Sequence, residues 1–116
     1  MKRPHSITIV TPSVTTNSRG EEVRDYTVPP ATTTTHRAWL QQDSAEEALS
    51  DGRDKVGRKW LAMIVSPGLR VTGIERVVWT NSAEGTVVFE VWGPGEPAYT
   101  GTRYHHHELT LRRVDG

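Results

Sequence analysis

Valine and threonine are unusually frequent in this chain, and the bias toward β-branched residues constrains the fold more than any other feature. The sequence holds 13 valines and 15 threonines against 6 leucines. β-branched side chains lose rotamer freedom in a helix but fit the pleated, half-buried surface of a sheet. The composition therefore predicts a protein built from strands.

Apolar runs separated by turn-forming residues divide the chain into short segments. Gly, Pro, Asn and Ser gather at 16–22, 66–68, 81–85 and 93–101, which are therefore expected to be turns or loops. Pro29 and Pro30 argue against a central strand in the link at 28–35. Strands are expected at 6–14, 35–42, 56–65, 73–80, 86–93 and 102–114. The pattern predicts an all-β fold, namely a small antiparallel β-barrel of five to six strands, with a sandwich as the alternative.

One polar segment interrupts this pattern. The chain of 116 residues is expected to form a single domain, 1–116, that buries roughly two-thirds of its unfolded surface. Within it, the segment at about 43–55 is rich in charged residues. We expect one long charged loop there, or a short helical turn that Asp43 or Ser44 caps and Gly52 closes.

Several expected strands carry apolar side chains on both faces. In 59–65 (KWLAMIV) and in 86–92 (TVVFEVW) apolar residues occupy both sets of alternating positions. In the strand at 35–42, Ala38 and Leu40 share one face and Trp39 lies on the other. A soluble barrel leaves one face to water, so a second apolar face predicts a neighbouring subunit or, alternatively, an internal cover.

Charge and composition exclude several classes of protein. The 14 basic and 14 acidic side chains balance, which argues against a protein held to DNA or to an acidic membrane by net charge. Four tryptophans would suit a stacking surface for single-stranded DNA, but such surfaces usually carry a basic surplus. The absence of cysteine excludes disulfides and cysteine nucleophiles. No segment has the roughly 20 apolar residues of a membrane span, so a soluble protein made in a cytoplasm is expected.

The run of three histidines at 105–107 raises the question of a metal site. On a strand, His105 and His107 should share one face, and two such imidazoles can bind a metal if a third ligand, such as His36, is near. A cupin-like barrel also uses an H-x-H pair, but it needs a later histidine that this sequence lacks. His5 is expected in an unstructured start. We interpret the run as part of a half-exposed strand, with a metal-binding barrel built on His105 and His107 as the alternative.

No other pattern indicates a reaction. The chain has no G-x-S-x-G elbow, no P-loop and no G-x-G-x-x-G opening a helix, and its acidic residues near 46–47 are typical of a solvated loop. We therefore predict no catalytic residue, no cofactor and no metal.

Four pieces, in order, carry a resemblance to a known family. They are "NSRGEEVRDY", "AWLQQDSAEEALSDGRD", "WLAMIVSPGLRVTGIERVVW" and the ending from Val91 to Gly116, which contains "HHHELTLRRVDG". Together they cover most of the chain. Their arrangement resembles the head-to-tail stopper proteins (head-closure or head–tail joining proteins) of long-tailed bacteriophages, particularly those of actinobacterial hosts.

The resemblance implies a structural virion protein without enzymatic activity. Such a β-barrel subunit belongs to a six- or twelve-fold homo-oligomeric ring in the phage neck, at the head–tail junction. The ring lies below the portal and head-to-tail adaptor, closes the DNA channel at head completion, and provides the docking surface for tail attachment through the tail terminator or tail tube. Another neck or tail ring protein, an adaptor or a tail terminator, is the alternative within the virion.

The resemblance also implies roles for particular residues. The candidates for the subunit interface are Trp39, Trp60 and Trp92. A channel-facing loop that repels or contacts the packaged DNA would contain Asp43, Glu46, Glu47, Asp51, Arg53, Asp54 and Lys55.

Overall fold

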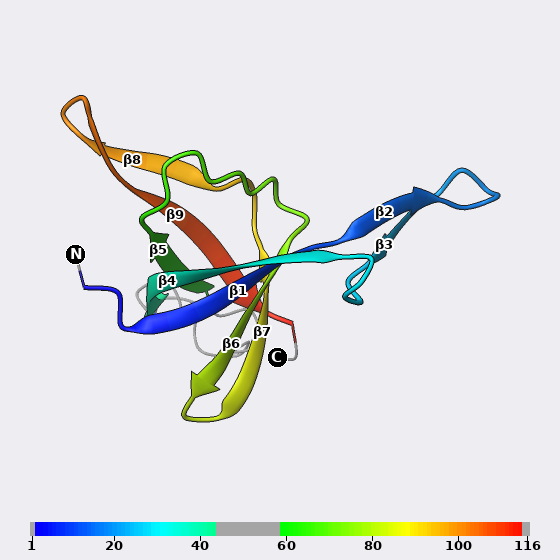
Figure 1. The fold of residues 1–116 in the computed structure, drawn as a ribbon, viewed down its shortest axis with the longest axis horizontal. Coiled ribbons are helices and arrows are strands. Elements are labelled where there is room, and N and C mark those ends of the chain that lie inside the picture. The colour runs from blue at the N-terminus through cyan, green and yellow to red at the C-terminus, as the bar shows by residue number, and fades with distance from the viewer. Residues whose placement is uncertain (1, 44–58, 115–116) are drawn as a thin grey trace, which may run out of the picture.

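A computed structural model describes residues 2–43 and 59–114, and within these ranges the chain forms strands and no helix (Figure 1). Nine strands follow one another within the described residues. They are β1 (His5–Thr11), β2 (Ser13–Thr16), β3 (Glu22–Asp25), β4 (Thr32–Asp43), β5 (Lys59–Ile64), β6 (Arg76–Ser82), β7 (Gly85–Val91), β8 (Glu96–Thr100) and β9 (Arg103–Arg113).

Six of these strands close into an antiparallel barrel. The order is β5-β4-β1-β6-β7-β9, and pairing of β9 with β5 completes the circle. The long strand β9 pairs with β5 along one edge, while its other edge pairs first with β8 and then with β7. Closure removes the unpaired edges that an open sheet would expose. The predicted small antiparallel barrel is confirmed, with β8 as an extra strand beside it.

The core of the barrel consists of inward-facing residues at alternating positions. Its largest fully buried side chains are Phe89, Ile7, Ile64, Leu109, Leu111 and Val77. Two alanines, Ala38 and Ala62, are completely buried among them, as expected where small and large residues together fill a narrow barrel. Ala38 and Leu40 face this core and Trp39 does not, as the sequence predicts.

Three predicted boundaries were wrong, each for a local reason. Pro12 has no backbone N–H, and the strand expected at 6–14 ends at Thr11 and resumes as β2. The second strand begins at Thr32, not at 35, because the threonines that follow the two prolines pair with β1. The strand expected at 73–80 begins only at Arg76, because a turn occupies the residues before it.

Two strands were not predicted at all. The segment at 93–101, expected to be a loop, contains β8, which tolerates Pro97 because only one of its edges is paired. The short strand β3 follows the turn at 16–22 and forms a separate two-stranded sheet with β2. We call this hairpin, residues 13–25, the arm.

The arm projects away from the barrel (Figure 1). Every residue from Val14 to Asp25 is exposed, and among the described residues the two strands pair only with each other. Asn17 orders the tip, because its side-chain Oδ1 accepts the backbone N–H groups of Arg19 and Glu21 at 2.9 and 3.0 Å. The arm is therefore an ordered hairpin that lacks a hydrophobic cover of its own.

Truncating the centre of the core should be far more harmful than truncating the arm. We expect Phe89→Ala to lower the free energy of unfolding by about 3–5 kcal/mol, because it removes a completely buried ring that packs against Trp60. The control Val23→Ala, on the exposed arm, should change it by less than about 0.5 kcal/mol. Urea unfolding of both variants measures the difference, and similar losses would contradict a core centred on Phe89.

Candidate functional site

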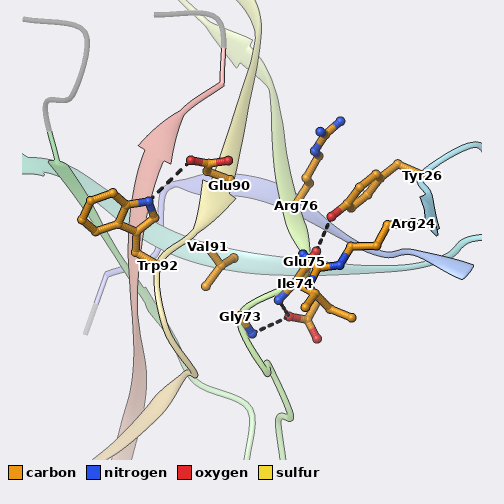
Figure 2. A pocket seen from close by; sticks show the side chains of 9 residues that line it. All are labelled: Arg24, Tyr26, Gly73, Ile74, Glu75, Arg76, Glu90, Val91 and Trp92. Carbon is orange, nitrogen blue, oxygen red and sulfur yellow. Dashed lines mark hydrogen bonds between the residues drawn. The ribbon is translucent and has the colours of Figure 1, made fainter. Parts of the chain in front are cut away.

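A groove lies where the arm joins the barrel (Figure 2). Its volume is about 430 Å³. The arm and the residue after it supply Arg24 and Tyr26, the start of β6 supplies 73–76, and the end of β7 supplies 90–92. We call it the arm groove.

The floor of the arm groove is organised by a buried carboxylate. Glu75 is only 4% exposed, and its Oε1 accepts the backbone N–H groups of Thr72, Gly73 and Ile74 at 3.0, 2.9 and 3.1 Å. The hydroxyl of Thr72 lies 3.1 Å from the other carboxylate oxygen. Successive N–H groups of this kind form a concave anion site. Because the chain's own carboxylate fills it, the turn is held rigid and is not open to an external anion.

Two loops meet beneath this turn, and glycine makes the contact possible. Gly73 has φ of +112°, and a Cβ there would lie 3.4 Å from the backbone of Gly93. Gly95 donates its N–H to the carbonyl of Val71 at 2.8 Å, and a Cβ on it would lie 2.7 Å from the Cδ2 atom of Leu109. The glycine-rich stretch before β8 therefore lets two loops pack closely against the barrel.

One wall of the arm groove is basic and aromatic. The hydroxyl of Tyr26 donates to the carbonyl of Ile74 at 2.6 Å, which fixes the arm to the barrel. The guanidinium of Arg76 lies over the Tyr26 ring, 4.0 Å from its centroid. Arg24 lies beside them, and its hydrogen bond with the Glu22 carboxylate, 2.6 Å away, raises the pKa of the Arg24 guanidinium.

The opposite wall is acidic and aromatic. Trp92 is 46% exposed, and its Nε1 donates weakly to Glu90 at 3.5 Å. The guanidinium of Arg112 lies 3.5 Å from the centroid of the Trp92 ring. Arg76 and Glu90 are directly opposite in the pairing of β6 with β7, yet in the described part of the chain no ion pair joins them. A cation and an anion therefore face the groove with capacity for further partners, which suits a polar polypeptide.

The three tryptophans predicted for an interface have different surroundings. Trp92 is at the arm groove. Trp39 is half-buried on the outside of β4, where its Nε1 donates to Gln41 at 2.9 Å. Trp60 is partly buried, where it packs against the barrel core and lies edge-on to Trp79. Their contact with another subunit stays a prediction.

The predicted channel-facing loop lies almost wholly outside the described residues. Asp43 ends β4 and is paired in register with Lys59 of β5. Glu46, Glu47, Asp51, Arg53, Asp54 and Lys55 fall within 44–58, so the roles assigned to them stay predictions.

The histidine run belongs to strand β9, as predicted. His107 is buried, and its Nδ1 lies 2.7 Å from the Tyr104 hydroxyl. His105 is exposed and contacts His106, whose Nε2 lies 2.9 Å from the Glu108 carboxylate. His105 and His107 thus have separate partners, and residues 2–43 and 59–114 contain no group of three side chains placed to hold a metal ion.

The other two histidines lie on barrel strands. His36 is on β4, where its Nε2 lies 2.9 Å from the Thr34 hydroxyl. His5 was expected in an unstructured start, and this was wrong. It begins β1, accepts the backbone N–H of Leu40 at 3.0 Å, and packs edge-on against Trp79. A tertiary hydrogen bond and ring packing thus hold His5 in a strand that the local sequence does not predict.

Sequence reasoning missed the arm groove. Its residues come from three separate segments, so no spacing along the chain brings them together. One signal was present: a glutamate between Ile74 and Arg76 breaks the apolar pattern at the start of a strand. Such a residue either faces solvent or accepts several hydrogen bonds, and only the fold distinguishes the two.

Taken together, the described residues define a closed six-stranded antiparallel β-barrel with a hairpin arm. No protein-family model matches the chain, and no curated protein matches it either. Among solved structures it is similar to the solution structure of protein SF1141 from Shigella flexneri 2a, with a TM-score of 0.61 and 21% identity over 95% of this chain and 91% of that chain. At this identity the likeness shows the fold alone. The described segments include no helix that is long and apolar enough to cross a membrane.

Removing the charge of Glu75 should loosen the floor of the arm groove. We expect Glu75→Gln to lower the free energy of unfolding by about 2 kcal/mol, because charge-assisted hydrogen bonds from a buried turn are lost or weakened. Hydrogen exchange of the amides at 72–74 should accelerate. The exposed Glu90→Gln is the matched control and should leave both quantities nearly unchanged. Unaltered exchange in the Glu75 variant would contradict the role of the carboxylate.

Acid should destabilise the fold through His107. Burial, followed by the nearby His106, lowers the pKa of His107 below the ordinary value of 6.5 that it regains on unfolding. Protonation therefore favours the unfolded chain: the contribution of His107 to stability is complete above pH 6.5 and is lost as pH falls from there toward the lowered pKa.

His107→Gln isolates this contribution from that of His36, whose pKa is also lowered by burial. Urea unfolding at about pH 8 and about pH 5.5 should show a smaller loss of stability on acidification in the variant than in the wild type. Equal losses would mean that His107 does not titrate differently in the folded and unfolded chains.

Proposed function

We propose that this protein is a structural subunit of a phage neck ring, a head-to-tail stopper that closes the DNA channel of the filled head and provides the tail docking surface. The observation that carries the proposal is the combination of a closed barrel with a projecting, fully exposed arm. The six barrel strands offer no open edge for association, so assembly through added strands is left to elements outside the barrel, which are the arm and β8. The arm is such an element.

The four stretches of sequence that resemble the head-to-tail stopper proteins, and their order along the chain, support a place in the phage neck. The predicted channel-facing segment is connected to the barrel at Asp43 and Lys59, two paired residues at the end of neighbouring strands. The protein acts in this proposal by binding and blocking, without catalysis, and its partners are copies of itself, the adaptor–portal complex above and the tail terminator or tail tube below.

Another ring protein of the neck or tail is the nearest competing function. Adaptors are mostly helical, whereas residues 2–43 and 59–114 of this chain contain strands and no helix. A tail terminator remains as the competitor. The two differ in phenotype, because loss of a terminator alters the tails themselves, and loss of a stopper leaves the tails normal.

A nonsense mutation in the gene tests the proposal. In lysates of a phage that carries a stop codon in its copy of this gene, electron microscopy should show DNA-emptied or leaking tailless heads beside free tails of normal length. Suppression of the stop codon is the control and should restore joined particles. Free tails of abnormal length would favour a terminator, and intact infectious particles would contradict a place in the neck.

A further inference from the structure

Within residues 2–43 and 59–114, no other strand pairs with the arm to stabilise it. An isolated two-stranded hairpin is at best marginally stable in water. Here the outward faces of the arm carry the exposed apolar residues Val14 and Val23, which are 46% and 43% exposed, and Tyr26 anchors only its root. An ordered hairpin of this kind is suited to being covered by another surface on assembly.

The tip of the arm presents one charge of each sign on a fixed turn. Arg19 and Glu21 follow each other closely, and Asn17 holds the backbone of both. Glu21 accepts one hydrogen bond from the Asn17 amide at 3.1 Å, which leaves its second oxygen available. The guanidinium of Arg19 is exposed, and within the described ranges it has no hydrogen bond or ion pair.

The arm groove carries the complementary pair. Arg76 contributes a cation that stacks on Tyr26, and Glu90 contributes an exposed anion on the other wall (Figure 2). The tip cannot fill the groove of its own chain, because the four residues of β3 separate Glu21 from Tyr26 at the root of the arm by roughly 13 Å or more. Arm and groove are thus complementary surfaces that a single copy cannot join.

We propose that the tip of the arm docks in the arm groove of a second copy of this chain, with Arg19 paired to Glu90 and Glu21 paired to Arg76 of that copy. Such a contact joins two different surfaces, so each copy still offers one arm and one groove, and repetition builds a ring when the rotation between copies closes. The contact between arm and groove would supply the subunit interface of the proposed neck ring. Only the closure into that ring rests on the proposed function.

Two other occupants fit less well. DNA phosphates would meet the Glu90 carboxylate in the groove as well as its arginines. The unpaired edge of β8 is a competing site for the arm, but Glu96, Pro97 and an irregularity between Ala98 and Tyr99 blunt that edge. The arm groove has no such obstruction.

Disulfide trapping tests the contact directly, since the chain has no cysteine of its own. One preparation carries Arg19→Cys and a second carries Glu90→Cys, and the two are mixed at low micromolar concentration under mild oxidation. Docked thiols have an effective concentration near millimolar, so the mixed disulfide should exceed that of a control pair by at least about tenfold. The control replaces Glu90→Cys with Glu84→Cys, an exposed glutamate at the turn between β6 and β7. Mass spectrometry quantifies the mixed product.

A charge exchange at the second pair gives an independent readout. Adding Glu21→Arg to the arm variant places like charges together and should lower the yield of mixed disulfide by about tenfold. Adding Arg76→Glu to the Glu90→Cys variant as well should restore most of the yield of mixed disulfide. Circular dichroism confirms that each variant is folded.

Yields equal to those of the Glu84→Cys control would overturn the contact and would assign the groove to a partner other than a second copy. A yield that is high but unaffected by the exchange would overturn the pairing of Glu21 with Arg76. Neither result depends on the lysate phenotype: trapping can succeed for a protein outside the neck, and a stopper can assemble through other surfaces.

Discussion

Pairing of β9 with β5 is the interaction on which the rest of the structure depends. It converts a row of strands into a closed barrel, so the backbone groups of both end strands are satisfied and the interior is shielded from water. The buried residues that line it, from Ile7 to Leu111, then form one continuous core. Closure also has a consequence outside the core: recognition is left to elements attached to the barrel, chiefly the arm and the loops at its root.

Those loops are positioned by polar contacts and close packing more than by apolar burial. The Glu75 carboxylate accepts hydrogen bonds from the N–H groups of its own turn. Tyr26 connects the arm to that turn by a hydrogen bond to the carbonyl of Ile74. The neighbouring loop approaches through Gly95, which has no room for a side chain. The barrel and its loops therefore determine the shape of the arm groove. The exposed charges of the groove can differ between proteins with the same fold without loss of the scaffold.

The sequence predicted the fold where local pattern and tertiary pairing agree. Alternation placed Ala38 and Leu40 inward and assigned the histidine run to a strand, and both are observed. Prediction from the sequence failed where pairing with a distant segment decides the structure. Thr32 is in a strand because it pairs with β1, and β8 forms because it pairs with the edge of β9. The arm groove was beyond reach for the same reason, since its charges come from three segments that only the closed barrel brings together.

We propose that this barrel is a ring subunit of the phage neck, joined to its neighbours by arm and groove. Cryo-electron microscopy of the neck of a phage that carries this gene tests it most directly. We expect a ring of six-stranded barrels below the adaptor, each with its arm seated between Tyr26 and Trp92 of the next copy. A neck reconstruction whose density is fully explained by other proteins would contradict it.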